Sequence, residues 1–354
     1  MRFVADDNYV NITGRTLFYD GVRYMNYSCS SIEFLFTGNR VEAEFWTNSC
    51  MLEGSRKAWI AVFVDEGQEP LKRIAVDHEG TYLLYEEKMD TGTVFKERKL
   101  TLVKYSEVAY GKVGIKSIII DGELPPIPTS KRERRIEYIG DSITCGYGSE
   151  GVWNQEEFDT STENPWEGYA AITARSLNAD YHLVSWSGIG VISNYTEEDV
   201  ANDEWLMPVM YPYADKATDL VLGKQEPQAW NFDAFVPDCI VINLGTNDAS
   251  YTKNKSDRVK SFGKEYYRFL KYIRSMNPTS ELVCTLGAMG QELCGEIKEQ
   301  VLRLKSEGEQ HIHYMEFDVQ LEEDGIGVDW HPSRLTHKKM AAKLEKRVRE
   351  VMGW

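Results

Sequence analysis

Long apolar runs, excess positive charge and patterned cysteines are all lacking in this chain of 354 residues. No segment reaches about 18 consecutive apolar residues, the length a helix needs to cross a bilayer. Acidic side chains outnumber basic ones by 56 to 40, and the formal net charge of −16 opposes binding to nucleic-acid phosphates and anionic lipid surfaces. The sequence therefore excludes a membrane-spanning helix and argues against nucleic-acid and membrane partners.

The six cysteines are scattered without C-x-x-C spacing. This spacing suggests neither a zinc site nor a small disulfide framework, and we expect no bound metal. The first residues, Met1 to Asp7, lack the apolar core of a secretory signal. We therefore expect a cytoplasmic protein, or a secreted one if a leader has been removed.

Residues 1–122 have the pattern of an all-β domain. The alternating runs 32–36 and 41–46 predict strands, and the turn at 37–40 between them predicts a hairpin. Closely spaced strands without amphipathic helices indicate an antiparallel sandwich, with a jelly roll preferred. The proline-rich and charged residues 123–134 that follow predict an extended, exposed linker.

In residues 135–354, strands alternate with helices. The predicted strands cover residues 136–139, 182–185, 239–244, 282–286 and 312–317. The predicted helices cover residues 168–177, 256–276, 295–306 and 336–352. This alternation predicts a flavodoxin-like, three-layer α/β domain with a mostly parallel sheet, whose ligands bind beyond the carboxyl ends of the strands.

Four short motifs lie after these strands or in the last loop. They are Gly140-Asp141-Ser142, Ser187-Gly188-Ile189-Gly190, Gly245-Thr246-Asn247-Asp248 and Asp329-Trp330-His331-Pro332. Each has a structural explanation when taken alone, such as a helix cap, a glycine turn or an Asx turn. Together, in this order, they supply the parts of one acyl-transfer reaction.

Each motif suggests one role in that reaction. Ser142 is the expected nucleophile, and His331 is the expected general base and acid. The backbone N–H groups of Ser142 and Gly188 and the side chain of Asn247 are the expected oxyanion hole. The remaining histidines lack the loop position of His331, and this chemistry needs no metal or organic cofactor.

The motifs resemble those of the SGNH hydrolases, the Gly-Asp-Ser-type esterase superfamily. Its four namesake residues match Ser142, Gly188, Asn247 and His331. The sandwich, residues 12–16, residues 140–148 and residues 329–333 look like carbohydrate esterase family 2, whose members include acetyl xylan esterases. The resemblance implies removal of acetyl groups from plant polysaccharides or from xylo- and manno-oligosaccharides, often at the sugar 6-position. It leaves oligomeric state open, and a homo-oligomer is possible.

One position departs from the superfamily pattern Asp-x-x-His. Val328 stands where the carboxylate is expected, and Asp329 lies two residues before His331. Either Asp329 orients the imidazole by a different loop path, or a backbone carbonyl accepts the ring N–H and leaves a Ser–His dyad. Trp330 could face a sugar ring or simply pack within the loop. Weaker candidates for sugar contact are Trp153, Trp166, Trp205 and Tyr195.

Two other functions compete with deacetylation. An SGNH lipase or thioesterase would act on longer acyl chains, although the polar and aromatic loops favour a short acyl group. A carbohydrate-binding protein without catalysis would use the sandwich to hold glycan. All four catalytic positions are filled, which argues against this second alternative.

Overall fold

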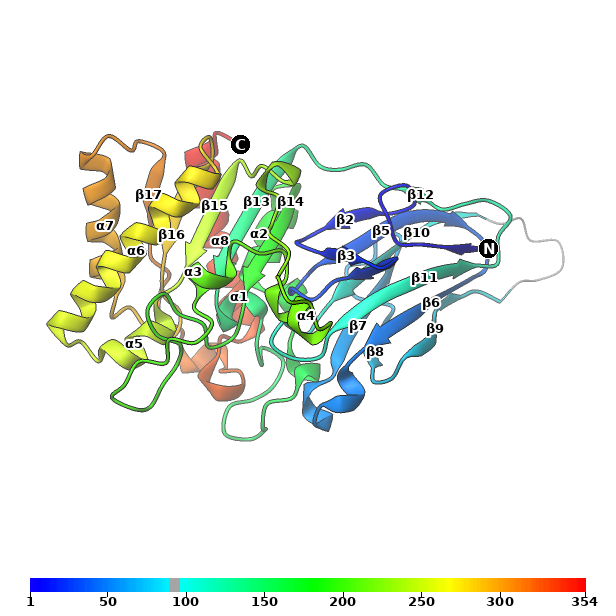
Figure 1. Ribbon diagram of the computed structural model, residues 1–354, viewed down its shortest axis with the longest axis horizontal. Coiled ribbons are helices and arrows are strands. Elements are labelled where there is room, and N and C mark those ends of the chain that lie inside the picture. Colours follow the sequence, from blue (N-terminus) through cyan, green and yellow to red (C-terminus); the bar gives the residue numbers. More distant parts are fainter. Residues whose placement is uncertain (89–95) are drawn as a thin grey trace.

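A computed structural model describes residues 1–88 and 96–354 and shows an all-β region joined to an α/β region (Figure 1). The β region contains two antiparallel sheets, which we call the outer and the inner sheet. None of the helices in the described residues combines the length and apolar character required for crossing a membrane.

The outer sheet has the order β3-β4-β11-β6-β9, with β1 also paired to β11. Its strands are β1 (Arg2–Phe3), β3 (Leu17–Tyr19), β4 (Val22–Tyr24), β6 (Arg40–Thr47), β9 (Gly80–Glu86) and β11 (Val113–Ile120). The inner sheet has the order β12-β5-β10-β7-β8, with β2 also paired to β5. Its strands are β2 (Asn11–Thr13), β5 (Ser31–Thr37), β7 (Ala58–Val64), β8 (Lys72–Val76), β10 (Glu97–Lys104) and β12 (Ile127–Pro128).

The predicted hairpin between residues 32–36 and 41–46 is wrong. β5 belongs to the inner sheet and β6 to the outer sheet, so the connection between them crosses the sandwich. Phe34 of β5 and Phe45 of β6 both lie in the core between the sheets. Alternating apolar residues fit either a hairpin or such a crossing, because both place every second side chain in one core.

The inner sheet is buried on both faces. Ile60 and Val62 of β7 belong to the sandwich core, whereas Ala61 and Phe63 belong to a second core that includes Tyr138 of the α/β region. Alternate side chains of a strand point to opposite faces. The inner sheet is therefore a layer shared by both regions.

The segment predicted as a linker, residues 123–134, is partly built into the fold. Within it, β12 pairs with β5 at the edge of the inner sheet. The Arg132 guanidinium donates to Asp180 Oδ1 at 3.1 Å, and Arg134 already begins the first strand of the parallel sheet. The connection is therefore held at both of its ends.

The parallel sheet has the order β14-β13-β15-β16-β17. Its strands are β13 (Arg134–Gly140), β14 (Ala179–Ser185), β15 (Cys239–Asn243), β16 (Glu281–Thr285) and β17 (Ile312–Tyr314). The α-helices are α1 (Ser142–Cys145), α2 (Tyr169–Ser176), α3 (Met207–Met210), α4 (Lys216–Val221), α5 (Thr246–Thr252), α6 (Ser256–Met276), α7 (Cys294–Ser306) and α8 (Arg334–Met352). Short 3-10 turns are η1 (Ser49–Met51), η2 (Gly54–Arg56), η3 (Thr160–Thr162), η4 (Pro165–Glu167), η5 (Phe232–Ala234), η6 (Glu322–Asp324) and η7 (Val328–Trp330).

Helices cover both faces of this sheet, as Figure 1 shows. Ile240 and Ile242 of β15 face a core that contains residues of α6 and α7, and Val241 faces the opposite core with residues of α2 and α8. The strand order is that of a flavodoxin-like sheet, so the predicted fold class is confirmed. In this order the crevice lies where the connections from β13 and β15 leave in different directions.

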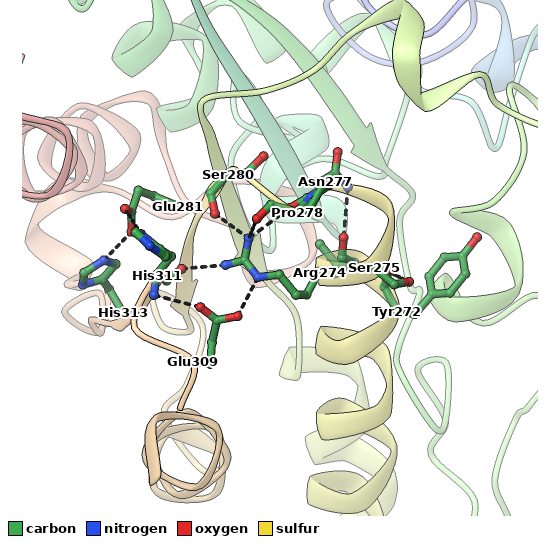
Figure 2. A network of polar contacts seen from close by, with 11 residues as sticks. Tyr272, Arg274, Ser275, Asn277, Pro278, Ser280, Glu281, Glu309, His311 and His313 are labelled. Atoms are coloured by element: carbon green, nitrogen blue, oxygen red, sulfur yellow. Dashed lines mark hydrogen bonds and ion pairs between the residues drawn. The ribbon is translucent and has the colours of Figure 1, made fainter. Parts of the chain in front are cut away.

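The amino ends of β16 and β17 are closed by a polar network around Arg274 (Figure 2). The guanidinium donates to Glu309 Oε2 at 2.7 Å, to Ser280 O at 2.7 Å and to His311 O at 2.8 Å. Glu281 bridges the rings of His311 and His313 at 2.7 and 2.8 Å. The network ties the carboxyl end of α6 to the amino ends of two strands, at the end of the sheet opposite to the four motifs.

Candidate active site

Ser142 lies at the sharp turn from β13 into α1. The Asp141 carboxylate caps the helix by accepting the Ile143 N–H at 3.0 Å. A side chain on Gly140 could not fit, because its Cβ would lie 2.0 Å from Thr144 Oγ1. The Ser142 N–H lies in the first turn of the helix, where backbone donors lack helical acceptors. The turn therefore presents a hydroxyl and, within the described residues, an N–H without a protein acceptor at the same point.

His331 meets Ser142 from the last loop. Its Nε2 lies 2.8 Å from Ser142 Oγ, and its Nδ1 lies 3.1 Å from the Val328 carbonyl oxygen. The carbonyl can only accept a hydrogen bond, so Nδ1 carries the proton and Nε2 is left to accept from the serine. This is the arrangement that a general base requires.

An unusual turn aims the Val328 carbonyl at the ring. Within η7, Asp329 and Trp330 both have left-handed backbone angles, with φ of 51° and 63°. Such conformations cost roughly 1–2 kcal/mol per non-glycine residue. Hydrogen bonds hold the turn in place: the Val328 N–H donates to Gly148 O at 3.0 Å, and Gln320 Nε2 donates to Trp330 O at 2.7 Å.

The Asp329 carboxylate points to a different partner. Its Oδ2 accepts the Tyr147 hydroxyl at 2.8 Å, and no hydrogen bond to the His331 ring is found in the described residues. Of the two arrangements left open by the sequence, the structure therefore shows the backbone carbonyl at the ring. Burial lowers the pKa of His331 to about 4, against the opposing influence of the Val328 carbonyl and the Asp329 charge. The imidazole is neutral at pH 7.

Gly188 and Asn247 lie beside each other after β14 and β15. Gly188 has φ of +77°, and its Cβ position is open, so the residue exposes backbone to the crevice. Asn247 Nδ2 donates to Ile189 O at 2.9 Å, which uses one of its two N–H groups. Neither the Gly188 N–H nor the second amide N–H has a protein partner in the part of the chain that the structure describes. Both are suitable oxyanion donors.

Asp248 fixes the loop that carries Gly188. Its carboxylate accepts the backbone N–H groups of Val191 at 3.0 Å, Ile192 at 2.7 Å and Ser193 at 3.1 Å. Burial raises the pKa of Asp248 to about 6 even though these donors favour its charge. Asp248 therefore holds the loop, and within the described residues its carboxylate has no hydrogen bond to Ser142 or His331.

Aromatic rings lie near His331 and Gly188. Trp330 contacts Trp153 edge to face, with centroids 4.4 Å apart, and Tyr147 lies 4.4 Å from the His331 ring. Trp205 and Tyr195 line a cavity of about 210 Å³ next to Gly188. Trp166 does not reach the crevice, because it packs on Phe63 in the core shared with the inner sheet.

Tyr147 lies in the 140–148 segment, but no role was predicted for it. The Tyr147 ring also stacks on Phe158, with centroids 3.8 Å apart. A tyrosine shortly after Ser142 was an available signal. In the described residues, no group of three or more His, Cys, Asp or Glu side chains is placed to hold a metal ion.

Two family descriptions match the chain. Residues 136–344 match the family described as GDSL-like Lipase/Acylhydrolase. Residues 12–128 match the family described as Carbohydrate esterase 2 N-terminal. The two matches fall on the α/β region and the β region in turn, and the second extends through β12.

Similar proteins point the same way. The cellulase/esterase CelE of Acetivibrio thermocellus is 32% identical over 90% of this chain, and the chain spans 38% of that protein's length. An acetylxylan esterase / glucomannan deacetylase of Cellvibrio japonicus is 26% identical over 99% of the chain and 91% of its own length. A solved family two carbohydrate esterase from Clostridium thermocellum, in complex with cellohexaose, is 30% identical with a TM-score of 0.84; the match covers 98% of this chain and 99% of that one.

Proposed function

The chain belongs to carbohydrate esterase family 2, and from this premise we propose that it is a serine esterase that removes O-acetyl groups from plant polysaccharides or their oligosaccharides. The observation that carries the proposal is the Ser142 Oγ to His331 Nε2 contact of 2.8 Å, with the opposite ring nitrogen bonded to a carbonyl. Two consecutive hydrogen bonds therefore connect the proposed nucleophile, the proposed base and the carbonyl that orients the ring.

The first half of the reaction forms an acetyl-enzyme. His331 Nε2 takes the proton from Ser142 as Oγ attacks the acetyl carbonyl carbon. The negative charge on the carbonyl oxygen is received by the N–H groups of Ser142 and Gly188 and by the Asn247 amide. When the intermediate collapses, the bond to the sugar oxygen breaks, and the imidazolium returns its proton to that oxygen.

The second half releases acetate. A water molecule gives a proton to His331 and attacks the acetyl carbon, and the same donors receive the new oxyanion. The bond to Ser142 Oγ then breaks, and the serine recovers its proton from the imidazolium. The Val328 carbonyl keeps the ring oriented through both halves, so the proposed catalytic pair is a Ser–His dyad.

The proposed substrates are acetylated xylan, glucomannan or their oligosaccharides. This choice is supported by a relative named acetylxylan esterase / glucomannan deacetylase, which the chain covers almost fully. Trp330, next to His331 in the chain, and its neighbour Trp153 supply indole rings on which a pyranose ring can pack. We assign Trp330 the substrate-binding role.

The test compares acyl length and sugar position. Acetate release is measured from acetylated xylan and glucomannan oligosaccharides and from defined 2-, 3- and 6-O-acetyl sugars, and activated acetyl, butyryl and octanoyl esters are compared. We expect the acetyl ester to be the best of the three esters. A preference for octanoate would replace the proposal with a lipase or thioesterase, and glycan binding without hydrolysis would replace it with a binding protein.

A further inference from the structure

Glu107 belongs to the β region, but its side chain contacts two segments that carry residues of the candidate active site. Its Oε2 accepts the Ser187 N–H at 2.7 Å, immediately before Gly188. The same oxygen lies 3.7 Å from Cys145 Sγ on α1, the helix that Ser142 begins. One carboxylate oxygen thus contacts both the loop of the oxyanion donor and the helix of the nucleophile.

We propose that Glu107 is a positioning residue of the esterase, which holds the Gly188 N–H at the correct place relative to Ser142 Oγ. This inference rests on the proposed function, because it assumes that these two groups act on one carbonyl. Oxyanion donors act at about 2.7–3.1 Å from the developing charge. A displacement of about 1 Å can reduce turnover roughly 100-fold.

The β region holds Glu107 firmly. Lys104, fully buried at the end of β10, donates to Ser106 O at 2.6 Å and to Glu107 O at 3.4 Å. From the α/β region, Glu163 Oε2 accepts the Glu107 N–H at 2.9 Å. The backbone of Glu107 is therefore clamped from both sides, so its side chain can act as a fixed support.

A second buried carboxylate between the two regions provides a contrast. Glu137 on β13 pairs with Arg15 at 3.1 Å, and both side chains are almost completely buried. That carboxylate contacts a cation, as a structural ion pair does. Glu107 forms no such pair in the described residues, and burial raises the pKa of its carboxyl. Its side chain contacts the active-site loop and α1, which favours positioning over simple adhesion.

The test replaces Glu107 in three ways. Glu107→Met keeps the side-chain length but removes the acceptor for Ser187. Glu107→Gln keeps an acceptor oxygen and removes the charge, and Glu107→Asp withdraws the acceptor by one methylene group. Glu137→Gln is the matched control, because it neutralises a buried carboxylate between the regions without touching the Ser187–Gly188 segment.

Turnover of an activated acetyl ester is measured per folded active site, which is counted with a serine-reactive phosphonate. We expect Glu107→Met to lower kcat about 10- to 100-fold with KM within about threefold, because only the oxyanion geometry changes. Glu107→Gln should recover most of that loss, and Glu137→Gln should leave kcat unchanged whatever its effect on Tm. Should Glu107→Met fail to fold, Glu107→Asp is expected to lower kcat about tenfold.

An unchanged kcat in folded Glu107→Met, or in Glu107→Asp as its substitute, would overturn the positioning role. A loss of kcat in Glu137→Gln as large as that in Glu107→Met would do the same, because it would show a general structural effect. Ser142→Ala is assayed in parallel. If that variant keeps its activity, the proposed function itself fails, whereas an inactive Ser142→Ala with normal Glu107 variants refutes only this inference.

Discussion

The two ends of the parallel sheet differ in whether their polar groups have hydrogen-bond partners. At the amino ends of β16 and β17, Arg274 uses its guanidinium to satisfy the Ser280 and His311 carbonyls and the Glu309 carboxylate. At the carboxyl ends of β13, β14 and β15, donors in the described residues are left without protein partners. They are the N–H groups of Ser142 and Gly188 and one N–H of Asn247.

This difference separates stability from chemistry within one sheet. Satisfied buried groups stabilise the folded state, whereas fixed but unpaired donors are available to an oxyanion. The loop that carries Gly188 is nevertheless held in place, because the Asp248 and Glu107 carboxylates accept hydrogen bonds from its backbone N–H groups. Changes at the carboxyl end should therefore affect rate, and changes at the amino end should affect unfolding.

The largest effect on rate is expected at Ser142, the proposed nucleophile. Ser142→Ala should reduce kcat for acetyl ester hydrolysis by about 10⁴-fold or more, because no covalent intermediate can form. Its Tm should stay near that of the wild type. The matched control is Ser149→Ala, which removes another buried hydroxyl from the same segment and should keep activity. Activity in Ser142→Ala would show that the nucleophile is elsewhere.

The next largest effect is expected at Asn247 of the proposed oxyanion hole. Asn247→Asp keeps the shape of the side chain but removes its N–H donors, and it should lower kcat roughly 100- to 1000-fold. Burst kinetics with a p-nitrophenyl ester would show whether acylation is the slowed step. A normal kcat in this variant would remove Asn247 from the oxyanion hole.

The acid limit of activity should report His331. Burial lowers its pKa to about 4, and only the neutral ring can take the serine proton. The value of kcat/KM should therefore be constant from neutral pH to about pH 5 and fall about tenfold per pH unit below about 4. Samples returned to pH 7 before assay control for acid unfolding. An acid limit near pH 6.5 would contradict the buried, neutral imidazole.

A smaller effect is expected at Asp329. Its carboxylate bonds to Tyr147 and acts on His331 only through its charge. Asp329→Asn should reduce kcat by less than about tenfold, whereas loss of an orienting triad aspartate costs about 10⁴-fold in other serine hydrolases. A loss of that size would show that Asp329 orients the ring during catalysis.

The smallest effect on rate is expected at the opposite end of the sheet. Arg274→Met should keep kcat within about twofold but lower the free energy of unfolding by about 2–4 kcal/mol, because it leaves several acceptors unsatisfied. Urea denaturation measures the loss. Arg268→Met on the exposed face of α6 is the control and should change stability by less than about 0.5 kcal/mol. An activity loss in Arg274→Met would break the separation between the two ends.

Much of the fold and of the geometry of the candidate site could be predicted, because hydrophobic periodicity and motif position are properties of the local sequence. The alternation of strands and helices after residue 135 predicted the α/β fold class, and it placed Ser142, Gly188 and Asn247 after adjacent strands. The sequence also left open a carbonyl partner for His331. It could not decide between that partner and Asp329, because the answer depends on left-handed backbone angles at two non-glycine residues.

Other features depend on contacts between distant segments. Alternation in residues 32–46 could not distinguish a hairpin from a crossing between sheets, because both bury the same side chains. Glu107 carried no signal, since it lies in the β region and its partner Ser187 lies in the α/β region. The burial of Ala61 and Phe63 on the second face of the inner sheet likewise depends on the α/β region, which the strand pattern does not reveal.

The shared inner sheet has a consequence for how this chain can be divided. Removing residues 1–122 would take Phe63 and Val103 away from the core that contains Tyr138 and Tyr181. A large apolar surface of the α/β region would then be exposed to solvent. The isolated β region would likewise expose the apolar second face of its inner sheet, which favours aggregation. Both regions should therefore unfold in a single cooperative transition. A fusion that transfers this enzyme to another protein has to include both regions together.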